Sequence, residues 1–120
     1  MAKTAATGIT RIINAAGYSW LGFKAACKYE AAFRQELTLT LILTPVALYF
    51  GATYADKAIL VASLVFILLI EILNSAIEAI VDRMGDEIHT LSGRAKDMGS
   101  TAVFLAFIIA GLVWFSVLYK

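Results

Sequence analysis

The sequence predicts an all-α membrane protein, with three transmembrane helices and an N-terminal amphipathic helix in a single domain of residues 1–120. Hydrophobic residues make up 61% of the chain and charged residues only 16%. Mean hydropathy is +0.82, so the chain is more apolar than a typical soluble domain. Three apolar stretches reach the length of about 20 residues that a helix needs to cross a bilayer. They cover residues 37–55, 58–80 and 100–119.

The N-terminal helix is expected at about residues 8–29, where apolar side chains recur at helical spacing. One face carries Ile9, Ile12, Ile13, Ala16, Trp20, Phe23 and Cys27. The opposite face carries Arg11, Asn14 and Tyr18. This pattern is typical of a helix that lies in the membrane interface, although a helix packed on the bundle would show it too. The first spanning stretch contains Pro45, which membrane helices tolerate.

Lysine and arginine gather before the first apolar stretch and in the loop between the second and third. Because such residues are retained on the cytoplasmic side, the N-terminus is predicted to be cytoplasmic and the C-terminus periplasmic. The basic residues form no stripe interleaved with aromatic residues, so nothing indicates a nucleic-acid partner. A single cysteine, Cys27, and a single histidine, His89, exclude an intramolecular disulfide and a histidine cluster.

A polar stripe interrupts the second apolar stretch. Glu71, Asn74, Glu78 and Asp82 are spaced so that they share one helical face. A charge inside a bilayer is costly, so this face is expected to meet a protein interior or a wet cleft. Glu71 lies well inside the apolar stretch, and a carboxyl group in such a setting suits a general base. Asn74 and the neighbouring Ser75 could equally join helices through hydrogen bonds.

Basic residues that could pair with these carboxylates lie on the predicted cytoplasmic side, among them Lys24, Arg34, Arg94 and Lys96. Carboxylates with Mg²⁺, together with lysine and arginine, are what nucleotide phosphates require. The physical pattern therefore predicts a polar, metal-capable site near the cytoplasmic interface. It does not separate an enzyme from an ion-coupled carrier.

Three long blocks closely resemble the prokaryotic integral-membrane diacylglycerol kinases. They read EAAFRQE, EILNSAIEAIVDR and HTLSGRAKDMGSTAV, and RIINAAGYSWLGFKAA near the start fits the same family. The resemblance implies a homotrimer in the bacterial inner membrane, with active sites between subunits. It implies transfer of the γ-phosphoryl group of MgATP to diacylglycerol, which yields phosphatidic acid and ADP.

The resemblance also assigns roles to particular residues. Glu71 matches the catalytic base and Asn74 the polar residue beside it. Glu30 and Glu78 match the pair that holds Mg²⁺ with ATP. Further nucleotide contacts fall on Arg11, Tyr18, Glu87, His89, Lys96 and Asp97. The lipid-side positions are Arg34, Gln35, Glu36, Ser100 and Trp114.

Three other functions compete with this interpretation. An undecaprenol kinase would keep the same nucleotide machinery, but the block LSGRAKDMGS is more similar to the diacylglycerol branch. A small cation-coupled multidrug transporter would also bury a glutamate, although it has no need for Glu30, Glu78, Lys96 and Asp97 together. A non-catalytic assembly subunit would leave the carboxylate stripe unexplained.

Overall fold

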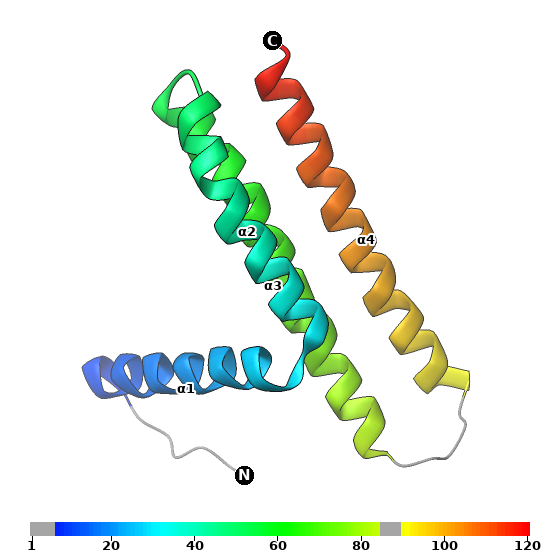
Figure 1. The fold of residues 1–120 in the computed structure, drawn as a ribbon. Helices are drawn as coiled ribbons and strands as arrows, with labels where there is room; N and C mark the ends of the chain where they lie inside the picture. The colour runs from blue at the N-terminus through cyan, green and yellow to red at the C-terminus, as the bar shows by residue number, and fades with distance from the viewer. Residues whose placement is uncertain (1–6, 85–89) are drawn as a thin grey trace.

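The protein is all α-helical throughout the part that the computed structural model describes, residues 7–84 and 90–120. Its helices are α1 (Gly8–Tyr29), α2 (Ala31–Phe50), α3 (Tyr54–Arg83) and α4 (Thr90–Leu118). α3 packs against both α2 and α4, while α1 lies across one end of these three helices (Figure 1). The prediction of an all-α fold is confirmed for these residues.

Two of these helices, α3 and α4, are long and apolar enough to cross a membrane, each with a mean hydropathy of 2.4. α2 contains most of the first predicted spanning stretch, and its mean hydropathy is too low for it to count as a candidate span. Its second turn holds Arg34, Gln35 and Glu36, and Pro45 lies further along. These residues lower the mean hydropathy of α2, so its role as a membrane span remains a prediction.

The predicted limits of the first stretch, 37–55, were wrong at both ends. α2 begins six residues earlier, at Ala31, and ends at Phe50. The next helix starts at Tyr54 because the Thr53 side chain accepts a hydrogen bond from the backbone N–H of Asp56 at 3.1 Å. Such an N-cap satisfies a donor that the first helical turn leaves free. A threonine followed three residues later by an acid was the available sequence signal.

The helices containing the other two stretches also extend beyond the predicted limits. α3 continues past residue 80 to Arg83, and α4 begins at Thr90 rather than at residue 100. Apolar composition marks the part of a helix suited to lipid, whereas backbone hydrogen bonding can carry the helix further into polar sequence. The described polar residues beside the apolar parts of α3 and α4 are therefore helical, which gives their side chains a defined spacing.

α1 matches the predicted range, 8–29, and its apolar face is largely uncovered within this chain. Ile9 is 76% exposed and Trp20 is 61% exposed. Near the other end of the helix, the Phe23 ring packs edge-on against Phe33 of α2, with ring centroids 5.9 Å apart. Phe33 is almost fully buried. α1 is therefore joined to the bundle near its C-terminus, and the exposed apolar face agrees with a helix in the membrane interface.

The core lies along α3, where it meets α4. Ile67 of α3 packs with Ala106 and Ala110 of α4, and all three are buried. Small residues at such a contact let two helices approach closely. At the far end, Trp114 donates to the Ser63 hydroxyl at 3.0 Å, and Lys120 pairs with the buried Asp56 at 2.6 Å. These contacts hold the C-terminal part of α4 against α3.

Candidate active site

The polar stripe on α3 is buried at its centre. Glu71 is only 5% exposed, and Asn74 and Ser75 are each 9% exposed. Each of these residues sits on the side of α3 that also carries the core residues Leu64 and Ile67. Burying polar groups is costly unless they find partners, so the contacts of this stripe decide what it can do.

The Asn74 amide links the two glutamates of the stripe. Its Nδ2 donates to Glu71 Oε2 at 3.4 Å and to Glu78 Oε1 at 3.5 Å. Both distances are longer than the usual range of about 2.7–3.2 Å, so each hydrogen bond is weak. A side-chain amide carries two N–H groups, so one asparagine can orient both carboxylates. Asn74 therefore couples the predicted base to a predicted metal ligand.

Glu36 of α2 reaches the same point and shares a side-chain hydrogen bond with Glu71. Two carboxyl groups can share a hydrogen bond only if one of them carries a proton. Glu36 precedes the predicted spanning stretch, and burial, with the neighbouring Glu71 carboxyl, raises the pKa of Glu36 to about 8. Glu36 was assigned to the lipid side, and the structure brings its carboxyl to the predicted base.

Arg34 closes the junction between α1 and α2. Its Nη1 donates to the carbonyl oxygens of Cys27 at 3.0 Å and Lys28 at 3.1 Å. These carbonyls lie in the last turn of α1, where acceptors lack helical partners and a cation is favoured. Glu30 is the residue between the two helices. Arg34, assigned to the lipid side, thus also fixes the position of Glu30, whereas its neighbour Gln35 is exposed.

Glu30 lines a cavity of about 410 Å³ between the end of α1 and the middle of α3. The lining residues are Gly22, Ala25, Ala26, Tyr29, Glu30, Ile72, Ser75, Ala76 and Ala79. Glu78, its predicted partner for the metal, does not line this cavity. Within the described residues, no group of three or more potential ligands gathers to hold a metal ion. Mg²⁺ commonly uses one or two carboxylates plus substrate phosphates, so the donor type fits a metal bound together with ATP.

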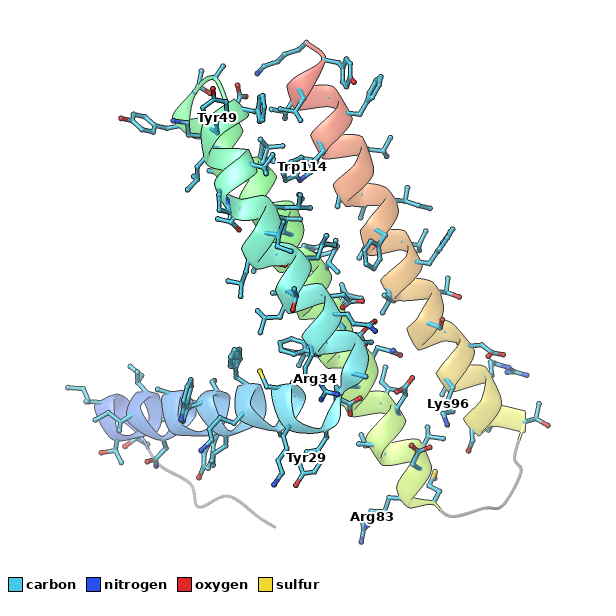
Figure 2. All side chains as sticks on the ribbon, in the orientation of Figure 1. Tyr29, Arg34, Tyr49, Arg83, Lys96 and Trp114 are labelled. Atoms are coloured by element: carbon cyan, nitrogen blue, oxygen red, sulfur yellow. The ribbon has the colours of Figure 1, made fainter. Side chains whose placement is uncertain are left out.

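Lys96 of α4 forms an ion pair with Asp82 of α3, with 2.9 Å between Nζ and Oδ1. Both side chains are substantially exposed, at 45% and 66%. The sequence placed Asp82 on the polar stripe but gave it no partner across the bundle. In the structure it holds the lysine that was predicted to neutralise phosphate charge. Arg34, Arg83 and Lys96 all lie at the same end of the molecule (Figure 2).

Other predicted site residues are spread over the chain. Arg11 lies near the end of α1 that points away from α3 and α4 (Figure 1), so one chain does not bring it to the stripe. Tyr18 lies midway along α1, and Asp97 and Ser100 are exposed on α4. Trp114 lies at the opposite end of the bundle from Lys96 (Figure 2). The nucleotide contacts expected at residues 87 and 89 fall outside the described residues.

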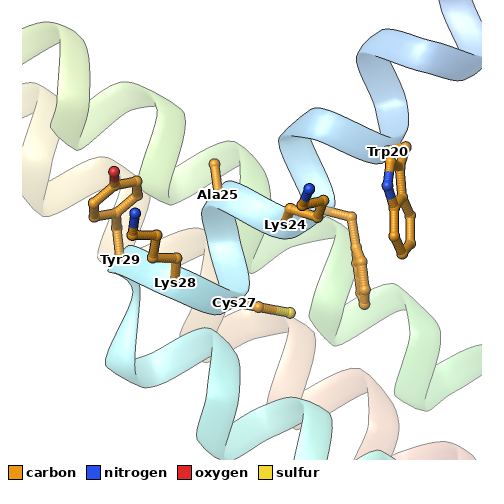
Figure 3. A pocket seen from close by; sticks show the side chains of 7 residues that line it. Trp20, Lys24, Ala25, Cys27, Lys28 and Tyr29 are labelled. Carbon is orange, nitrogen blue, oxygen red and sulfur yellow. The ribbon is translucent and has the colours of Figure 1, made fainter.

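A shallow groove of about 530 Å³ follows α1 (Figure 3). It is lined by Trp20, Phe23, Lys24, Ala25, Cys27, Lys28 and Tyr29. The Trp20 and Phe23 rings stack with centroids 5.9 Å apart, and Lys28 Nζ lies 5.2 Å from the centre of the Tyr29 ring. Aromatic rings beside lysines are typical of a surface at the level of lipid headgroups.

Comparison with known proteins decides among the candidate classes. A model of the family described as "Prokaryotic diacylglycerol kinase" matches residues 17–118. The chain belongs to this family. It is 51% identical to the diacylglycerol kinase of Escherichia coli K12 over 114 residues, which cover 95% of this chain and 93% of that protein.

Two further diacylglycerol kinases extend the likeness. The one from Haemophilus influenzae is 46% identical over 113 residues, which cover 94% of this chain and 96% of the relative. The one from Pseudomonas aeruginosa is 47% identical over 112 residues, which cover 93% and 91%. Membership of the prokaryotic diacylglycerol kinases confirms the sequence-based resemblance and identifies the chain as an enzyme of this family.

Proposed function

We propose that this protein transfers the γ-phosphoryl group of ATP to the primary hydroxyl of diacylglycerol at the cytoplasmic face of a bacterial inner membrane. The products are phosphatidic acid and ADP. The observation that carries the proposal is the buried carboxylate Glu71 on an apolar helix, joined through Asn74 to Glu78. Family membership supplies the reaction class, and this stripe supplies the chemistry.

Glu71 acts as the general base. It accepts the proton of the lipid hydroxyl while that oxygen forms its bond to the γ-phosphorus, and the bond to the ADP oxygen breaks. Glu71 lies about 18 Å along the axis from Arg83, the end of α3, so it meets a hydroxyl carried by a lipid rather than by a water-soluble alcohol. The hydrogen bond from Asn74 keeps the carboxylate oriented, and orientation accounts for much of the rate in phosphoryl transfer.

Glu78 and Glu30 would hold Mg²⁺ together with ATP, and the bound ion would supply positive charge beside the phosphates. Asn74 fixes the Glu78 carboxylate and Arg34 fixes the helix junction at Glu30. The remaining nucleotide contacts are Arg11, Tyr18, Glu87, His89, Lys96 and Asp97. Lys96 exchanges its Asp82 partner for phosphate oxygens when ATP binds, because a phosphate group carries more negative charge than one carboxylate.

The lipid approaches from the side of α2 and α4. Arg34, Gln35 and Glu36 border the headgroup region, and Ser100 and Trp114 border the path along α4. Glu36 adds a second function because its proton stabilises the pair that it forms with Glu71. The diacylglycerol hydroxyl must displace or share this hydrogen bond when it approaches the base.

Three identical subunits form the working enzyme, and each active site takes residues from two of them. Arg11 lies in the first turn of α1, and this end of the helix points away from α3 and α4 (Figure 1), which supports this arrangement. The apolar part of α2, from residue 37 onward, crosses the membrane beside α3 and α4. The end that carries Arg34, Arg83 and Lys96 (Figure 2) is cytoplasmic, since lysine and arginine are retained on that side, and the C-terminus is periplasmic.

The test is an ADP-release assay on purified protein in mixed micelles with MgATP, with and without diacylglycerol. We expect lipid-dependent turnover that the Glu71→Gln variant loses by a factor of at least about 100. Undecaprenol serves as the comparison acceptor. Turnover with undecaprenol alone would change the substrate and keep the mechanism. A correctly assembled protein without lipid-dependent turnover would refute the proposal and would direct attention to cation-coupled transport through Glu71.

A further inference from the structure

Gly99 of α4 is buried and faces the Asn74 side chain of α3. A Cβ atom added at Gly99 would overlap Asn74 Oδ1 and would lie 3.3 Å from Asn74 Cγ and 3.9 Å from Asn74 Cβ. These three atoms are the nearest to the added carbon, and all belong to one side chain. The space at residue 99 is therefore taken by the Asn74 amide itself.

The other side of this amide explains why its position matters. Nδ2 donates to Glu71 and Glu78, while Oδ1 is buried and has no hydrogen-bond partner among the described residues. The amide is planar, so Oδ1 can leave the surface of Gly99 only if the whole group rotates. That rotation would carry Nδ2 away from both carboxylates, because the nitrogen and oxygen are fixed to the same carbon.

We propose that Gly99 is a positioning residue for phosphoryl transfer, because its missing side chain keeps the Asn74 amide in the orientation that bridges Glu71 and Glu78. This inference rests on the proposed function of those two glutamates. It assigns to the block GRAKDMGS a role besides nucleotide contact, because the α4 backbone at Gly99 packs against the Asn74 side chain and limits its orientation.

The requirement is specific to residue 99. Gly93 and Gly111 lie on the same helix, and a Cβ at either would meet nothing within 4 Å. Glycine is less favourable than alanine in the interior of a helix, so alanine at residue 111 should be tolerated within this chain. At residue 99 the preference reverses, because the added methyl group displaces Asn74.

Four proteins test the proposal: the Gly99→Ala variant, the Asn74→Ala variant, their combination, and Gly111→Ala as the matched control. We expect Gly99→Ala to lower kcat by about 100-fold, which is the effect of a misplacement near 1 Å at a reacting site. The KM for diacylglycerol should change less than about threefold, whereas the KM for MgATP should rise because Glu78 also loses the hydrogen bond from Asn74. Gly111→Ala should keep kcat within about twofold.

The combined variant separates positioning from simple packing. With alanine at residue 74, the nearest atom left to a Cβ at residue 99 is the former Asn74 Cβ at 3.9 Å, an ordinary contact. Gly99→Ala should therefore lower the midpoint of unfolding in detergent in the parent but not in the Asn74→Ala background, and any residual kcat should also be unaffected there.

Three outcomes would overturn the proposal. Near-parental kcat in Gly99→Ala would mean that Asn74 adapts without loss. An equal drop in the unfolding midpoint in both backgrounds would mean that Gly99 serves helix packing alone. If Gly99→Ala left the unfolding midpoint of the parent unchanged, the predicted clash with Asn74 would not exist. If the parent protein showed no lipid-dependent turnover, the proposed function would fail, while the unfolding comparison would still decide whether Gly99 positions Asn74.

Discussion

Replacing Trp114 with phenylalanine removes the indole N–H that joins α4 to α3 while it keeps an aromatic ring. In the structure, Trp114 Nε1 donates to Ser63 Oγ at 3.0 Å, and Ser63 Oγ in turn donates to the carbonyl oxygen of Leu60 at 2.7 Å. The serine hydroxyl therefore keeps its own acceptor in the variant. Only the interhelical hydrogen bond is lost, so neither partner is left as a buried donor without an acceptor.

The size of the effect follows from this geometry. Hydrogen bonds between membrane helices contribute about 0.6 kcal/mol on average, with an upper value near 1.7 kcal/mol. We expect a coupling free energy of about 0.6 kcal/mol between Trp114 and Ser63, or a factor of about three in the unfolding equilibrium. Trp114→Phe alone should cost somewhat more, because the smaller ring also leaves space beside α3.

The assay is a double-mutant cycle with Trp114→Phe, Ser63→Ala and their combination, measured by equilibrium unfolding in a detergent titration. Steady-state kinetics on the same proteins test the proposed lipid-side role of Trp114. We expect the KM for diacylglycerol to rise in Trp114→Phe and to stay unchanged in Ser63→Ala, which keeps the indole. Additive effects on unfolding would refute the reasoning about the hydrogen bond. An equal rise in KM in both single variants would show that Trp114 affects lipid only through helix packing.

Three further predictions concern the opposite end of the bundle. Asp82→Asn should lower the KM for MgATP by about two- to threefold at low salt and leave kcat unchanged, because Lys96 no longer exchanges an exposed ionic partner; an unchanged KM would contradict this. Arg34→Lys should lower the unfolding midpoint and raise the Mg²⁺ concentration that gives half-maximal activity, since lysine cannot match the two carbonyl contacts of the guanidinium. An unchanged midpoint with an unchanged Mg²⁺ requirement would show that Arg34 does not hold the end of α1. We expect the activity of the parent to fall above about pH 8, because Glu36, with a pKa raised to about 8, then loses the proton it shares with Glu71 and repels that carboxylate. Glu36→Gln should remove this fall. An identical pH profile in the two proteins would argue against the pair.

The same pKa has a consequence for stability. The carboxyl of Glu36 keeps its proton in the folded protein up to about pH 8, whereas its ordinary value is 4.5. Between these two values the folded state binds more protons than the unfolded state, so the free energy of unfolding falls as pH rises. Glu36→Gln should flatten that slope, which unfolding titrations at several pH values would measure.

The described parts of the apolar segments and the polar stripe could be predicted from the sequence because both depend on local periodicity. Residues 58–80 are apolar on most faces, and Glu71, Asn74 and Glu78 recur at helical spacing; the structure keeps all of them on α3. α1 was predicted almost to the residue for the same reason. The helix ends were predicted less well, since they depend on capping hydrogen bonds of the Thr53 side chain and the Gly51 backbone N–H, which hydropathy does not register.

The sequence by itself determined that this is a helical membrane protein, that its carboxylates share one face, and which family it resembles. Those properties depend on the order and spacing of residues along one helix. Only the tertiary structure decided that Glu36 meets Glu71, that Lys96 pairs with Asp82, and that Gly99 lies against Asn74. Each of these contacts joins different helices, and its geometry depends on how the helices pack, which no periodicity within a single segment specifies.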